Sequence, residues 1–143
     1  MIVETLRTTD RATWERLFAG YNAFYGRDLP PELADRTWKE IQTADRIHAL
    51  GARIDGRLVG IAHFLTHPST TSADVCYLQD LFTDPDARGK GVARALITET
   101  EHWARERGCA RLYWQTHETN ETARRLYDQV AENRGFVQYV MQL

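Results

Sequence analysis

The sequence predicts an α/β fold in three layers, with helices on both faces of a mixed, mostly antiparallel central sheet. Hydrophobic segments with strand-like and helix-like spacing follow one another in the order β-α-α-β-β-β-α-β-α-β. Asp55-Gly56 separates two of the strands and is a strong hairpin signal, so these strands are expected to pair antiparallel. A strand, a glycine-rich loop, a helix and another strand follow, and this unit is expected to be parallel with a right-handed crossover.

The first part of the chain is expected to hold one strand and two helices. Residues 2–6 predict the strand, and Asp10 can cap the helix that follows. The apolar positions of that helix are Trp14, Leu17, Phe18, Tyr21, Phe24 and Tyr25. Residues 26–31 interrupt the helix with glycine and proline, and a second helix is predicted over 32–43. Its apolar positions are Leu33, Trp38 and Ile41.

The rest of the chain is expected to alternate between strands and helices. The strands are predicted over residues 47–54, 58–66, 75–83, 111–115 and 136–141. One helix lies between Gly91 and Gly108, because glycine commonly follows the last turn of a helix. A last helix starts at Thr119 or Asn120 and is closed by Gly135.

The length, charge and cysteine content of the chain exclude several classes of protein. A chain of 143 residues suggests one domain, residues 1–143, and a net charge of −2 without a dense basic run argues against a nucleic-acid partner. Cys76 and Cys109 lie far apart, which argues against a disulfide framework or a zinc site, and the five histidines lack metal-ligand spacing, so we expect no metal. His63, in an apolar strand, is expected to be a satisfied structural residue rather than a ligand. With neither a signal-peptide pattern nor a long apolar window, we expect no membrane contact and a cytoplasmic location.

The loop Arg88-Gly89-Lys90-Gly91 before the long helix predicts an anion site. Free backbone N–H groups and the positive end of the helix dipole would face a phosphate there, and glycine lets the backbone approach closely. The loop is not a Walker P-loop, and Arg94 stands where the dinucleotide fingerprint needs its third glycine. A nucleotide-binding domain that uses the same loop stays an alternative, which competition by CoA but not by ATP or NAD would exclude.

Two motifs together resemble the GNAT superfamily, the Gcn5-related N-acetyltransferases. Arg88-x-x-Gly91-x-Ala93 after the turn Asp84-Pro85 resembles the pyrophosphate motif of that family. About 30 residues later comes a second signature, which here consists of Asn120, Ala123, Leu126-Tyr127 and Gly135-Phe136. The resemblance covers nearly the whole chain and implies a GNAT-like three-layer fold and acetyl-CoA as cosubstrate.

The stretches 77–82 and 113–120 are similar to the subgroup that includes yeast histone and polyamine acetyltransferases and their bacterial relatives. This resemblance implies direct transfer of an acetyl group to a primary amine, either of a small or polyamine-like molecule or of a protein lysine. The alternative is a CoA-binding sensor or partner module of the same fold that lacks catalysis.

The resemblance also implies which residues hold the cofactor. A bulge would splay the strand at residues 78–83 and expose backbone groups to the pantetheine arm and the thioester, while the loop binds the pyrophosphate. The cofactor-binding set is Leu81, Phe82, Thr83, Arg88, Gly89, Lys90, Gly91, Val92, Ala93, Asn120, Ala123 and Tyr127. Asn120 would hydrogen-bond the pantetheine, cap the last helix, or do both, and Lys90 either contacts the ligand or is simply exposed.

Acetyl transfer needs an acid for the departing thiolate and a base for the incoming ammonium. Tyr127 occupies the family's general-acid position; the other interpretation is a core tyrosine. Asp80 is the first candidate for the base, and a structural or substrate-orienting role is the alternative, because many relatives carry glutamate where this chain has Gln79. His117 and Glu118 are weaker candidates.

The acceptor side is expected to involve Tyr21, Tyr25, Asp80 and Glu118. Acidic and aromatic groups around the first two helices would suit a cationic amine, and they further include Asp28, Glu32, Asp35 and Trp38. The alternatives are core packing for the aromatic residues and a solvated surface for the acidic ones. A single terminal strand, 137–141, would leave an unpaired edge, which a homodimer could cover by strand exchange or edge pairing. The alternative is a monomer with a frayed end.

Overall fold

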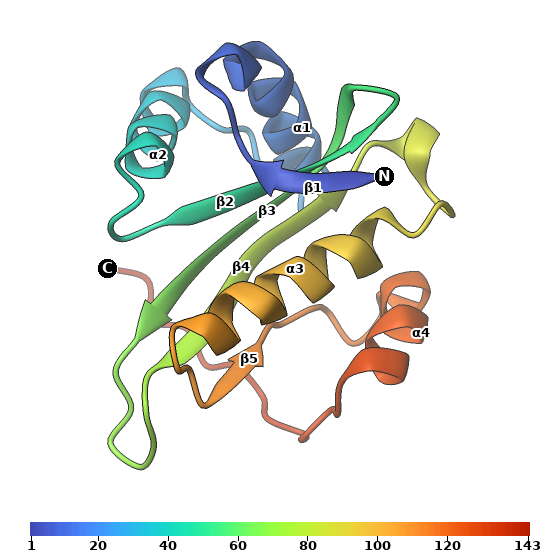
Figure 1. Ribbon diagram of the computed structural model, residues 1–143. Coiled ribbons are helices and arrows are strands. Elements are labelled where there is room, and N and C mark those ends of the chain that lie inside the picture. The colour runs from blue at the N-terminus through green and yellow to red at the C-terminus, as the bar shows by residue number, and fades with distance from the viewer.

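A computed structural model, which describes all 143 residues, contains a five-stranded sheet in the order β1-β2-β3-β4-β5 (Figure 1). The strands are β1 (Ile2–Thr5), β2 (His48–Ile54), β3 (Arg57–His67), β4 (Val75–Thr83) and β5 (Arg111–Tyr113). The first three pairs are antiparallel, and β4 pairs parallel with β5. The predicted mixed, mostly antiparallel sheet is therefore confirmed.

Helices cover both faces of this sheet (Figure 1), and the sheet separates the hydrophobic core into two clusters, one on each face. The helices are α1 (Arg11–Phe24), α2 (Pro31–Thr43), α3 (Val92–Glu106) and α4 (Glu121–Val130). On one face, Trp14 and Trp38 of α1 and α2 pack against Ile61 of β3. On the other face, Leu96 of α3 packs against Phe64 of β3, and α4 adds partly buried side chains. None of these helices is both long and apolar enough to cross a bilayer.

The local signals in the sequence placed most element boundaries within one or two residues. Asp55 and Gly56 both have positive φ, 49° and 76°, which is the geometry of a tight hairpin turn between β2 and β3. At the end of α3, Gly108 has φ 73° and the Cys109 N–H donates to the Ala104 carbonyl (3.0 Å). This helix-ending arrangement is the one that the glycine predicted.

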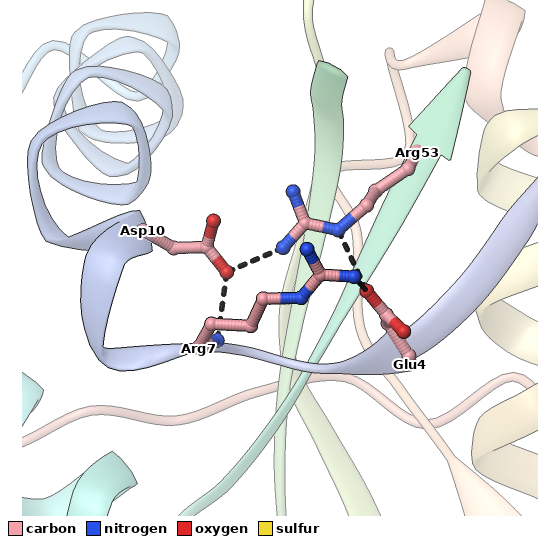
Figure 2. A network of polar contacts seen from close by, with 4 residues as sticks. All are labelled: Glu4, Arg7, Asp10 and Arg53. Atoms are coloured by element: carbon pink, nitrogen blue, oxygen red, sulfur yellow. Dashed lines mark hydrogen bonds and ion pairs between the residues drawn. The ribbon is translucent and has the colours of Figure 1, made fainter. Parts of the chain in front are cut away.

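Asp10 precedes α1 as expected, but its side chain does not cap the helix. Its carboxylate instead accepts hydrogen bonds from the Arg7 N–H (2.7 Å) and from Arg53 Nη2 (2.5 Å), as Figure 2 shows. Arg53 also donates through Nε to Glu4 (2.8 Å), and only 7% of Arg53 is exposed. This network joins β1, β2 and the entry to α1 through contacts between residues 43 and 49 positions apart in the sequence.

Three expectations about apolar residues were wrong. Phe24 was expected on the buried stripe of the first helix, but 59% of it is exposed because it lies on the far side of α1. Leu33 is 37% exposed on α2. Tyr25 follows the end of α1 rather than belonging to it.

The predicted final strand is absent, and the last helix ends at Val130 rather than near Gly135. Residues 132–143 make no backbone–backbone hydrogen bond and contain neither helix nor strand. The large apolar side chains of this segment are exposed: Phe136 92%, Tyr139 92% and Met141 84%. A strand forms only when its N–H and C=O groups find a partner edge, and local propensity does not supply one.

Candidate active site

The two parallel strands of the sheet separate in the middle of the fold. β4 pairs with β5 only from Val75 to Tyr77, and the rings of Tyr77 and Tyr113 lie 4.8 Å apart at the last paired position. The rest of β4 pairs with β3 alone. Its backbone groups on the β5 side therefore have no strand partner and are available to a ligand.

A register shift lies at the same place. Leu78 is opposite Phe64 and Asp80 is opposite His63, so Gln79 is an extra residue in β4. Such a bulge bends a strand and re-aims the side chain beside it. Here it turns the end of β4 away from β5 and places Asp80 beside the opening.

The glycine loop presents backbone N–H groups at the start of α3. Gly89 and Gly91 have φ of 76° and 80°, and a Cβ added to either would meet nothing within 4 Å. Gly91 is the N-cap of α3 and no side chain caps the helix, so the N–H groups of its first turn lack intrahelical partners. The loop is thus open, carries positive dipole charge and is shaped to receive an anion.

The side chains around this loop divide into two kinds. Arg88 is exposed, with its guanidinium carbon 5.9 Å from the centre of the Phe82 ring, and exposed Lys90 lines a cavity of about 130 Å³ that includes Asp84 and Asp86. Val92 is 2% exposed and packs in the core. The remaining side chains of the expected cofactor set on β4 and α3, those of Leu81, Phe82, Thr83 and Ala93, are half-buried.

On α4, the second motif brings a tyrosine and an amide toward the opening. The Tyr127 ring packs 5.4 Å from Trp114, and burial, with a contribution from Tyr25, raises the pKa of Tyr127 to about 12. Asn120 is the N-cap of α4, yet its side chain makes no cap hydrogen bond and donates instead to Thr116 Oγ1 (3.0 Å). Ala123 is half-buried one turn along the same helix.

The acceptor side is formed where the end of α1 meets the bulge in β4. Tyr25 contacts Tyr21 (ring centroids 5.1 Å apart) and His117 (5.6 Å), and the Tyr21 hydroxyl donates to the Gln79 carbonyl (3.4 Å). Burial raises the pKa of Tyr21, and the charge of Asp80 raises it further. Aromatic rings from α1 and a carboxylate from β4 therefore face one another.

One residue of this region was not predicted. The guanidinium carbon of Arg27 lies 5.1 Å from the Tyr25 ring centre and 5.6 Å from that of Tyr21. Arg27 is exposed and forms no ion pair. Because it lies in an irregular segment after Gly26, no periodicity in the sequence could have indicated its position.

The other residues expected at the acceptor side form no hydrogen bond or ion pair with Tyr21, Tyr25 or Asp80. Trp38 is a core residue, with its ring 5.0 Å from Trp14, and Asp35 forms an ion pair with Arg11. Glu118 is exposed, and only its backbone carbonyl is engaged, by Arg124. Asp28 and Glu32 are exposed as well.

Asp80 has a partner that sequence reasoning did not connect to it. His63, on the adjacent strand, was expected to be a satisfied structural residue rather than a ligand. Its Nδ1 lies 2.9 Å from Asp80 Oδ2, and its Nε2 lies 2.9 Å from Trp14 Nε1. The strand-pair register could have indicated the first contact, because His63 and Asp80 are opposite each other.

Comparisons with known proteins agree with this geometry. Residues 14–131 match the family model described as Acetyltransferase (GNAT) family. The chain is 32% identical over 143 residues to D-amino-acid N-acetyltransferase HPA3 of Saccharomyces cerevisiae, covering 97% of this chain and 89% of that protein.

Solved structures share the whole fold. The ribosomal-protein-alanine N-acetyltransferase of Brucella melitensis is 28% identical with a TM-score of 0.80, and each chain is covered completely. AAC(6')-Iy in complex with the bisubstrate analog CoA-S-monomethyl-acetylneamine has a TM-score of 0.87 at 21% identity, with 99% of this chain and 97% of that chain covered, and so shows the fold alone. The chain belongs to the GNAT acetyltransferase family and is an N-acetyltransferase that uses acetyl-CoA.

Proposed function

We propose that residues 1–143 act as one catalytic domain that transfers an acetyl group directly to the primary amine of a small molecule. The observation that carries this proposal is the unpaired edge of β4, which has the glycine loop at one end and Asp80 beside it. Tyr127, Tyr21 and Tyr25 approach the same opening. The loop proposed to bind the cofactor, the proposed acid Tyr127 and the proposed base Asp80 would thus lie around the same opening beside β4.

The cofactor residues proposed from the sequence fit this arrangement mainly through their backbone. The N–H groups from Arg88 to Ala93 bind the pyrophosphate, and the open space at Gly89 and Gly91 admits it. Leu81 to Thr83 offer backbone groups to the pantetheine arm, since this part of β4 has no neighbour on the β5 side. Asn120 and Ala123 line the α4 side, with the Asn120 amide turning from Thr116 to the ligand.

Acetyl-CoA supplies the acetyl group as a thioester. Asp80 accepts one proton from the incoming ammonium, which leaves a lone pair on nitrogen to form the N–C bond as the C–S bond breaks. Tyr127 donates its hydroxyl proton to the departing sulfur and regains the second proton that nitrogen loses. Asp80 then releases its proton to water, so the products are the amide, the CoA thiol and one proton. The Tyr127 hydroxyl is protonated at neutral pH, as an acid must be, because an ordinary phenol has a pKa near 10 and burial raises the pKa of Tyr127 to about 12.

The acceptor class is supported by Arg27. An exposed, unpaired guanidinium beside Tyr21, whose hydroxyl lies near Asp80, would repel a polyamine but would bind a carboxylate next to the reacting amine. We therefore propose an amino acid as the acceptor. The D-amino-acid N-acetyltransferase named among the relatives is consistent with this choice.

Acetylation of an amine panel tests the catalytic proposal against the alternative of a CoA-binding sensor. The panel holds D- and L-amino acids, their decarboxylated amines, a polyamine and a lysine peptide, with release of the CoA thiol as the readout. We expect wild-type turnover and a loss of about 10²-fold or more in kcat for Tyr127→Phe, with unchanged acetyl-CoA affinity. Tight binding of acetyl-CoA with no turnover of any amine would favour the sensor instead.

Removing the Arg27 side chain tests the acceptor class. Arg27→Ala should raise KM for an amino acid about tenfold, because an exposed charge-assisted hydrogen bond is lost, and should leave KM for the decarboxylated amine unchanged or lower. Arg36→Ala, an exposed arginine on α2, is the matched control. Equal effects of Arg27→Ala on the two acceptors would rule out recognition of the carboxylate.

We also propose a homodimer in which residues 136–141 of one chain pack on the open edge of β5 in the other. The exposed apolar side chains of this segment support it, since they form an apolar surface that a partner would bury. Light scattering should give twice the 16.5 kDa mass for wild type and a monomer for Phe136→Asp/Tyr139→Asp. Phe24→Asp, at another exposed aromatic residue, should leave the dimer intact.

A cytoplasmic location is part of the same proposal. Cys76 is buried and Cys109 is partly buried, and both are free thiols. Free thiols fit a reducing compartment, where acetyl-CoA would also be met.

A further inference from the structure

A chain of two hydrogen bonds runs from the core of the protein to the proposed base. Trp14 on α1 is 0% exposed and His63 on β3 is 1% exposed. Trp14 Nε1 donates to His63 Nε2 (2.9 Å), and His63 Nδ1 lies 2.9 Å from Asp80 Oδ2. The Trp14 ring is itself held by Phe18 and Trp38, whose ring centroids lie 5.3 and 5.0 Å away.

The chemistry of the tryptophan decides which nitrogen of His63 carries the proton. An indole N–H can only donate, so Nε2 of His63 must accept with its lone pair. The proton of the neutral imidazole is therefore on Nδ1, where it is donated to the Asp80 carboxylate. His63 cannot take a second proton on Nε2 without breaking its bond to Trp14.

The row of hydrogen bonds Trp14–His63–Asp80 reaches solvent only at Asp80. The Asp80 side chain retains 12% of its area exposed, whereas His63 retains 1%. The second oxygen of Asp80 is not engaged by His63 and can face the acceptor side, where Tyr21 lies. A proton can thus enter the chain at Asp80 but cannot pass beyond it.

We propose that His63 is a positioning residue that, fixed by Trp14, aims the Asp80 carboxylate at the amine of the acceptor. This inference rests on the proposed role of Asp80. In the step concerned, an N–H bond of the substrate ammonium breaks, an O–H bond forms on the free oxygen of Asp80, and the electron pair stays on nitrogen. His63 keeps its own proton throughout, holds one oxygen in place and so leaves the other oriented toward the substrate.

The geometry favours this role over a purely structural one. Burying an indole N–H, an imidazole and part of a carboxylate between α1 and the sheet gains little stability over well-packed apolar side chains. Phe18 packs edge-on against His63 with ring centroids 5.0 Å apart, so the ring is also held in orientation by packing. The two hydrogen bonds of His63 instead fix the orientation of the Asp80 carboxylate.

Two amide substitutions separate the two hydrogen bonds of His63. In His63→Asn the amide nitrogen stands near the position of Nδ1 and can still donate to Asp80; in His63→Gln the amide lies near Nε2, beside Trp14. Each variant keeps one bond and loses the other, so both should lose comparable stability in thermal unfolding. We expect His63→Asn, which keeps the donor to Asp80 but loses the bond to Trp14, to lose a few-fold in kcat, and His63→Gln to lose about 10- to 100-fold, with KM for both substrates nearly unchanged.

A second acceptor distinguishes loss of base positioning from general damage. The best acceptor of the panel is compared with an analogue that carries a trifluoromethyl group on the carbon bonded to nitrogen, whose amine is mostly neutral at about pH 8 and needs no base. The defects of His63→Gln and of Asp80→Asn should shrink to a few-fold on this analogue. The same kcat in both His63 variants, or an equal loss with the neutral amine, would overturn the inference.

Nitrogen NMR of the wild-type protein gives a test that needs no variant to fold. The His63 imidazole should show the tautomer protonated on Nδ1, and a tautomer protonated on Nε2 would contradict the chain of bonds. The failure of wild type to acetylate any amine is a different result, because it would overturn the proposed function before any His63 variant is compared.

Discussion

Replacing Gly91 with glutamate should weaken acetyl-CoA binding at least 100-fold, which isothermal titration will measure. We expect micromolar binding by wild type, about −8 kcal/mol, so the variant should lose about 2.7 kcal/mol or more. Gly91 is the N-cap of α3 with φ 80°, and the space before its Cβ position is empty. A glutamate there would put bulk and negative charge where the N–H groups should meet the pyrophosphate.

The matched control is Gly108→Glu at the other end of the same helix. Gly108 has φ 73° and also has nothing within 4 Å of a Cβ position, so the substitution imposes a similar backbone strain of about 1 kcal/mol. It should lower stability and leave acetyl-CoA affinity unchanged. ATP and NAD, titrated into wild type, should not compete. Unchanged acetyl-CoA affinity in a folded Gly91→Glu protein would show that the loop does not bind the cofactor.

Replacing Arg53 with methionine should lower the free energy of unfolding by about 3–5 kcal/mol, because it leaves a buried carboxylate without its cation. Asp10 is 7% exposed and would keep only the hydrogen bond from the Arg7 N–H (Figure 2). For a chain of this length the loss corresponds to a fall in Tm of roughly 10 °C or more. Urea unfolding followed by circular dichroism measures it directly.

Arg46→Met is the matched control, in which an exposed ion pair is broken instead of a buried one. Arg46 also pairs with a carboxylate, that of Glu40, but 76% of its side chain is exposed, so its removal should cost less than about 1 kcal/mol. A double variant, Arg53→Met/Asp10→Asn, should recover much of the stability because the unpaired charge is gone. Similar losses in the two arginine variants would mean that burial of the Arg53 network is energetically unimportant.

Lowering the pH should reduce the difference in the free energy of unfolding between wild type and Arg53→Met. The hydrogen bond from Arg53 is the main reason that the pKa of Glu4 lies below its ordinary 4.5. The stability gained from the charged Glu4 is therefore present above about pH 4.5 and is lost as the pH falls through the lower pKa of the folded state. Unfolding measured at pH 7 and at pH 4 will show whether the gap between the two proteins closes in this direction.

Local signals were sufficient to predict the elements from β1 to α4 and the open glycine loop before α3. The hairpin at Asp55-Gly56, the helix end at Gly108 and the N-terminus at Gly91 each depend on a residue that tolerates positive φ or forms a specific turn. Those requirements act within a few residues, so they can be read without the fold. The family motifs on the first turns of α3 and α4 are local in the same sense.

The terminal strand and the Asp10 cap failed for a common reason. Residues 136–141 have strand-like composition, but a strand is stabilised by a neighbouring edge, which is a property of the assembled sheet. Asp10 has the right residue type for a cap, but Arg53, 43 residues away, engages its carboxylate. In the first case a partner strand is missing, and in the second a distant residue, Arg53, binds the side chain that would otherwise cap the helix.

By itself, the sequence determined the order of the elements from β1 to α4, the mixed sheet and the open glycine loop at the start of α3, because periodicity and turn chemistry are local. Only the tertiary structure decided how Arg27 reaches Tyr21 and Tyr25, and that Trp14 and His63, 49 residues apart, form a line of hydrogen bonds to Asp80. These contacts depend on how α1 lies across the sheet. That placement comes from burial of its apolar side chains, and the spacing of these residues shows which face of α1 is buried but not where on the sheet the helix lies, because the hydrophobic effect is non-directional.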